Sequence, residues 1–81
     1  MKYYAKNKNT GDMNETKIMA IVMNMSKHDG RPWNTEEVED GLSKADGLLM
    51  DDKYFYFSDQ ASVSTVERIH SACVKKEVRN G

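Results

Sequence analysis

The first strong pattern in the chain is an apolar stripe at helical spacing. Four residues fall at i, i+3, i+4 and i+7, and they are Ile18, Ile21, Val22 and Met25. Met19 and Met23 widen this stripe, so we expect a helix that is buried on more than one side. Six consecutive apolar residues, 18–23, would also suit a buried strand. The pattern leaves that alternative open and favours the helix.

We expect this first helix to begin near Asp12 and to end at Gly30. Asp12, with Glu15 three residues later, resembles a capping box in which Asp replaces Ser or Thr. Lys27 and His28 suit the last turn, where cations meet the partial negative charge of the helix C-terminus. Gly30 can adopt the left-handed conformation that often ends a helix.

A second helix has the best-marked start in the sequence. Asn34 is a strong N-cap, and Glu37 is placed to reach back to it. Trp33 and Val38 have the spacing of a hydrophobic staple. We expect this helix to stop at Gly47.

The second helix has one apolar face and one acidic face. The apolar positions are Val38, Leu42 and Ala45, and the opposite side holds Glu36, Glu39, Asp40 and Ser43. A solvated surface is the ordinary explanation for such an acidic face, and a binding surface is the alternative.

Residues 48–57 predict a β-hairpin that is apolar on both faces. With a turn at Asp52-Lys53, alternation places Leu48, Met50, Phe55 and Phe57 on one face and Leu49, Tyr54 and Tyr56 on the other. A turn at Asp51-Asp52 keeps the same two sets. If the first face packs on the core, the second is either covered by another element or open as an aromatic patch.

A last helix is predicted after the hairpin. Ser64 with Glu67 forms an S-x-x-E capping box, and Asp59 is a rival cap. The inward residues are Val63, Val66, Ile69, Cys73 and Val74, and the basic residues on or beside the opposite face are Arg68, Lys75, Lys76 and Arg79.

These elements predict an α+β fold in a single small globular domain, 1–81. It contains about three helices and a β-hairpin, and the segment from Lys2 to Lys6 is a candidate third strand of an antiparallel sheet. A chain of 81 residues has a modest core. The longest apolar run is too short to cross a membrane, no secretory signal is visible, and Cys73 is the only cysteine. We therefore expect a cytoplasmic protein without a membrane partner.

The sequence carries no set of residues that we would assign to catalysis, and we expect no enzyme, cofactor or metal. His70 and Cys73 at i, i+3 supply at most two metal ligands, where a site needs three or four. Cys73 is predicted to face the core, where a thiol is ordinarily inert, and His70 has no visible partner to orient it as a base.

The charge distribution points instead to binding. Residues 29–59 hold nine acidic and three basic residues, a net charge of −6, while residues 1–10 carry +3 and residues 60–81 carry +2. Such an acidic segment favours encounter with a basic surface. We therefore expect a small protein-binding inhibitor or regulator, of the accessory kind that phages and other mobile elements carry. Its expected binding residues are Glu36, Glu39, Asp40, Leu49, Tyr54 and Tyr56.

The expected partner is a protein with a basic surface, such as one that handles nucleic acid. An uncovered tyrosine face could equally close a homodimer. The alternative function is a small DNA-binding regulator that uses Arg68, Lys75, Lys76 and Arg79. A net charge of −1 provides little counterion-release affinity, so nucleic acid is the less favoured ligand.

Overall fold

The structure is a computed structural model that describes residues 1–78, with side chains described for residues 1–73. Its elements in chain order are β1 (Tyr3–Asn7), β2 (Met13–Thr16), α1 (Ile18–Asp29), α2 (Thr35–Leu42), β3 (Leu49–Met50), β4 (Tyr54–Ser58) and α3 (Val63–Val78). The expected α+β class is confirmed. None of the helices in this described part has the length and apolar character needed to cross a membrane.

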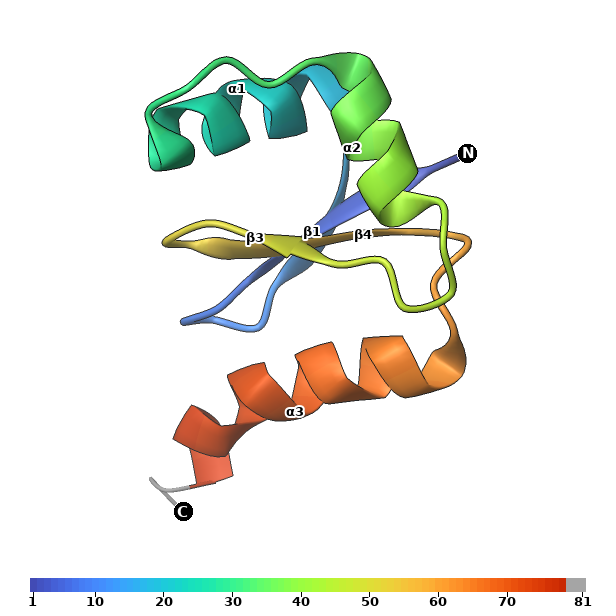
Figure 1. The fold of residues 1–81 in the computed structure, drawn as a ribbon. Helices are drawn as coiled ribbons and strands as arrows, with labels where there is room; N and C mark the ends of the chain where they lie inside the picture. The colour runs from blue at the N-terminus through green and yellow to red at the C-terminus, as the bar shows by residue number, and fades with distance from the viewer. Residues whose placement is uncertain (79–81) are drawn as a thin grey trace.

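The four strands form one antiparallel sheet in the order β2-β1-β4-β3. The helices α1 and α2 cover one face, and α3 lies on the other (Figure 1). The candidate N-terminal strand is confirmed as β1, at the centre of the sheet. The sheet has one strand more than the expected maximum, because β2 was predicted as the start of a helix.

The β2 segment corrects the predicted start of the first helix. Residues 13–16 pair with 3–6 of β1, so Asp12 and Glu15 do not form a capping box. The helix begins instead at Ile18, where Lys17 occupies the cap position without a side-chain hydrogen bond. The end of the helix is as expected, since Gly30 adopts a left-handed φ of 66° and its N–H bonds to the Ser26 carbonyl. Pairing with the open side of β1 outweighed the local cap signal.

The main core lies between the sheet and the α1–α2 pair. Its buried members are Tyr3, Ile21, Val22, Met25, Val38, Leu42 and Tyr56. Full burial of one such side chain contributes about 1.5–3 kcal/mol. Met19 and Met23 are exposed, which contradicts the expectation that α1 is buried on more than one side. No second layer covers the outer side of this helix in the described structure.

The start of α2 is as predicted, but its end is not. The Asn34 side chain accepts a hydrogen bond from the Glu37 N–H at 2.9 Å, so Asn34 is the N-cap. The helix ends at Leu42 rather than continuing to Gly47, and Ala45 is exposed in the following loop. The chain turns back so tightly that a Cβ on Gly47 would lie 2.5 Å from the Gly41 carbonyl oxygen.

The hairpin of β3 and β4 has the predicted register, with Met50 opposite Phe55 and Leu49 opposite Tyr56. The Asp51 carboxylate closes the turn by accepting the backbone N–H groups of Lys53 and Tyr54, each at 2.8 Å. These two hydrogen bonds to the Asp51 side chain stabilise a turn whose sequence lacks the favoured Asn-Gly pair.

The second face of the sheet packs on α3. The rings of Tyr4 and Phe57, which are partners across β1 and β4, stack with centroids 5.5 Å apart. Thr65, Ile69 and Cys73 are the buried positions of α3 among its described side chains.

The N-cap of α3 is Ser62, whose hydroxyl accepts the Thr65 N–H at 3.2 Å. The predicted caps Ser64 and Asp59 are therefore wrong. Val63 was expected inside and is exposed, since it occupies the first position of the helix. The predicted inward position of the Val74 side chain lies outside the described residues.

Candidate interaction surface

The exposed side of α2 carries three carboxylates without ion-pair partners among the described residues. Glu36, Glu39 and Asp40 are all solvent-exposed. Val38 and Leu42 anchor the opposite side of the helix in the core. The structure thus brings together the acidic half of the predicted site, and these three residues define what we call the acidic surface.

The charge of this surface acts on the hydroxyl of Tyr3, which is buried in the core. Burial raises the pKa of the Tyr3 hydroxyl, and the nearby charges of Glu39 and Asp59 raise it further. Both carboxylates are exposed, Glu39 on α2 and Asp59 directly after β4.

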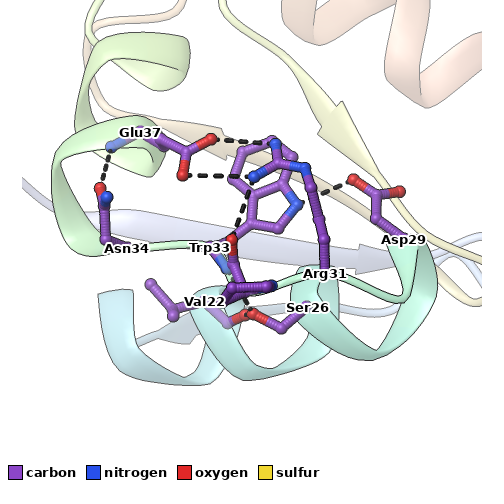
Figure 2. A network of polar contacts seen from close by, with 8 residues as sticks. Val22, Ser26, Asp29, Arg31, Trp33, Asn34 and Glu37 are labelled. Atoms are coloured by element: carbon purple, nitrogen blue, oxygen red, sulfur yellow. Dashed lines mark hydrogen bonds and ion pairs between the residues drawn. The ribbon is translucent and has the colours of Figure 1, made fainter.

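A neighbouring acid, Glu37, is neutralised within the chain (Figure 2). Its carboxylate pairs with the Arg31 guanidinium through two hydrogen bonds of 2.9 and 3.3 Å. The hydrogen bond from Arg31 lowers the pKa of Glu37, and the same bond raises the pKa of Arg31. The sequence predicted that Glu37 would reach back to Asn34, and its carboxylate bonds Arg31 instead.

The connection between the helices sets where the acidic surface lies. The Arg31 guanidinium stacks 4.4 Å from the Trp33 ring, and the Trp33 indole N–H donates to Asp29 at 2.8 Å. The Trp33 backbone N–H donates to the Ser26 hydroxyl at 2.9 Å, and that hydroxyl donates to the Val22 carbonyl at 2.7 Å. These bonds, drawn in Figure 2, tie the start of α2 to the middle of α1.

The aromatic half of the predicted site is covered from within the chain. Tyr56 is only 1% exposed and belongs to the core beneath α1 and α2. Leu49 and Tyr54 are partly buried and pack against the same core. The covered alternative is therefore correct for Tyr56, whereas Leu49 and Tyr54 are covered only in part.

The Tyr56 hydroxyl belongs to a polar network that the sequence did not reveal. It donates to the Asp51 carboxylate and accepts from the Asn24 side-chain amide at 3.0 Å. Burial and the bond to Asp51 raise the pKa of Tyr56. Partial burial acts to raise the pKa of Asp51, but hydrogen bonds from Tyr56 and from the turn backbone bring that pKa below its ordinary value.

A shallow polar hollow of about 470 Å³ lies beside this network, between the end of α1 and the β3–β4 turn. Its lining residues are Asn24, Lys27, His28, Asp51, Asp52, Lys53 and Tyr54. His28 Nδ1 lies 3.3 Å from the Asp52 carboxylate across it. The sequence predicts a turn at Asp51-Asp52-Lys53 but does not indicate that the end of α1 lies beside it.

The described residues include no group of three or more His, Cys, Asp or Glu side chains that could hold a metal ion. Cys73 is buried on α3, whereas His70 is exposed.

The alternative nucleic-acid surface can be followed only in part. Arg68 is exposed on α3, beside a shallow hollow that it lines with Ser64 and Ser71. The side chains of Lys75 and Lys76, and the whole of Arg79, lie outside the described residues.

Two methionines of α1 form a feature that sequence reasoning placed inside. Met19 is 55% exposed and Met23 is 67% exposed. They fall four residues apart, and Ser26 continues the same stripe three residues after Met23. The Ser26 hydroxyl accepts the backbone N–H of Trp33, two residues before α2, so this methionine stripe borders the start of α2. Helical spacing had identified the stripe, but it could not show that no layer covers it.

Comparisons with protein-family models, with curated proteins and with solved structures find no match for this chain.

Proposed function

We propose that this protein is a non-enzymatic binding module that inhibits or regulates a partner protein with a basic surface. The single observation that carries the proposal is the acidic surface of α2. Its three exposed carboxylates have no ion pair among the described residues, while the neighbouring Glu37 is fully engaged by Arg31.

Unpaired charge of one sign supports a role in encounter. Opposite potentials steer two proteins together and raise the association rate, and they disfavour partners of the wrong charge. The rigid attachment of α2 to α1 supports the same role, because a preorganised surface loses little freedom on binding. A protein that handles nucleic acid presents a basic surface of this kind, which makes it a suitable target for an accessory regulator.

The proposal is tested by reversing the charge of the acidic surface. The variant Glu36→Lys, Glu39→Lys and Asp40→Lys is compared with wild type by affinity capture from a host extract. The purified captured protein is then titrated by calorimetry. A matched control is Asp12→Lys, Glu15→Lys and Glu67→Lys, which changes the net charge equally at exposed positions away from α2.

We expect the α2 variant to lose the captured protein and the control to retain it. Binding should also weaken as salt is raised, because the contacts are electrostatic. Equal capture by all three proteins would refute the proposal, and so would a partner whose affinity does not depend on salt.

A further inference from the structure

We propose that the partner contacts this chain through an amphipathic α-helix, which packs its apolar side on Met19 and Met23 and places Lys or Arg residues over α2. This inference rests on the proposed function, which gives the charge of the partner, and adds the shape of the element by which the partner binds. Its starting point is the methionine stripe on α1, which leaves two large apolar side chains in solvent.

The stripe and the acidic surface lie over the same end of the sheet. Met19 is in the first turn of α1, which begins two residues after Thr16, and Thr16 pairs with Tyr3. Glu39 on α2 lies close enough to Tyr3 for its charge to raise the Tyr3 pKa. The C-terminal end of α2 also lies over this end of the sheet, because the Leu42 carbonyl accepts a hydrogen bond from the hydroxyl of Ser58. Ser58 is the residue of β4 that pairs with Tyr3.

The two helices therefore form a pair with an apolar ridge on α1 and carboxylates on α2. Both helices lie together above the sheet in Figure 1, and their outer side is turned away from it. An apolar ridge of two methionines with charge along one flank is complementary to a helix that is apolar on one side and basic on the other.

The chemistry of the ridge favours a helix as the occupant. Residues four apart on one helix are about 5–6 Å from each other, which matches the spacing of side chains at i and i+4 on a second helix. Methionine side chains are flexible and polarisable, so they adapt to a packed partner without a preformed pocket. Lys27 follows Met23 by four residues, so the basic side of the partner should lie over α2 and away from that lysine.

A synthetic helix tests the inference without knowledge of the natural partner. The probe is a peptide of leucine and lysine with its leucines at i, i+3, i+4 and i+7. The control peptide has the same composition with the leucines scattered around the helix. Binding is followed on the full chain through the methyl resonances of its six methionines. Met50 is an internal control, because it is 46% exposed on the opposite face of the sheet.

We expect the amphipathic peptide to shift Met19 and Met23 but not Met50, and to bind more tightly than the scattered peptide. The variant Met19→Gln, Met23→Gln should weaken binding by about tenfold or more, because the apolar contact is lost. Met50→Gln should leave binding unchanged. Methionine and glutamine have similar helix propensities, so α1 should remain folded, which circular dichroism verifies.

The outcomes separate this inference from the proposed function. If the methionine variant binds normally while the variant with Lys at 36, 39 and 40 does not, the helix-docking inference is wrong and the electrostatic proposal stands. If neither variant loses the peptide, both are wrong. If the Met19 and Met23 resonances move on dilution without peptide, a second copy of the chain is the occupant and the inference of a partner helix is overturned.

Discussion

The hydroxyl of Tyr56 donates a hydrogen bond to the carboxylate of Asp51, five residues earlier in the same hairpin. Tyr56 is at the centre of the core, and Asp51 closes the turn through the backbone of Lys53 and Tyr54. One contact therefore links the packing of α1 on the sheet to the conformation of the β3–β4 turn.

Removal of this hydroxyl should destabilise the fold. Tyr56→Phe keeps the ring but leaves a buried carboxylate oxygen of Asp51 without its donor, which costs about 1.5–3 kcal/mol for a bond to a charged group. Urea denaturation followed by circular dichroism measures the change. Tyr4→Phe is the matched control, and we expect it to be nearly neutral. Equal effects of the two substitutions would show that the Tyr56 bond contributes no stability.

The same pair should shape the pH dependence of folding. The pKa of Asp51 is lower in the folded state, so its contribution is full above about pH 4 and is lost as the pH falls through the folded pKa. The pKa of Tyr56 is raised, so its contribution is full below about pH 10 and is lost as the pH rises further. Asp51→Asn should therefore be less stable than wild type at pH 7, and the difference should shrink towards pH 3. A difference that is constant with pH would contradict this linkage.

Two glycines should respond to alanine with opposite signs. A Cβ on Gly47 would lie 2.5 Å from the Gly41 carbonyl oxygen and 2.9 Å from the Leu42 Cα, so Gly47→Ala must displace backbone and should cost about 1–3 kcal/mol. A Cβ on Gly41 would meet Leu49 at an ordinary 3.6 Å, and alanine is the better helix former. Gly41→Ala should stabilise the protein by up to about 1 kcal/mol. Thermal unfolding of the two variants in parallel checks both signs.

Loss of the α2 N-cap should destabilise the helix that carries the acidic surface. Asn34→Ala removes the acceptor of the Glu37 N–H and should cost about 1 kcal/mol. Asn34→Ser preserves a capping oxygen and should remain close to wild type. Hydrogen exchange at the Glu37 amide reports the effect locally, and unchanged protection in the alanine variant would contradict it.

Local signals predicted the parts of the fold that local contacts determine. Asn34 and the residues after it specify a helix start within one turn, and the alternation around Asp52-Lys53 determines which hairpin residues share a face. Both were correct. The Asp12–Glu15 pattern also resembled a local cap, but those residues pair with β1, and a cap motif contains no information about an unpaired strand edge elsewhere.

The candidate site was predictable only in its charged half. The acidic face of α2 follows from helical periodicity, because Val38 and Leu42 had to be buried. Tyr56, whose face the sequence left either covered or open, lies in the core, and Met19, which was expected to be buried, lies in solvent. Apolar character alone does not tell which of two candidate faces a third layer will cover, since that depends on how the helices cross the sheet.

The strand order has a consequence for how the chain is made. Tyr3 pairs with Ser58, so the central strand of the sheet waits for a partner that is synthesised 55 residues later. Until β4 emerges from the ribosome, β1 has only β2 beside it, and a two-stranded ribbon is marginally stable in water. Closure of this long loop slows folding and leaves the edge of β1 open to other chains in the meantime. The β1 and β4 segments therefore become structured together, only after residue 58 has been synthesised.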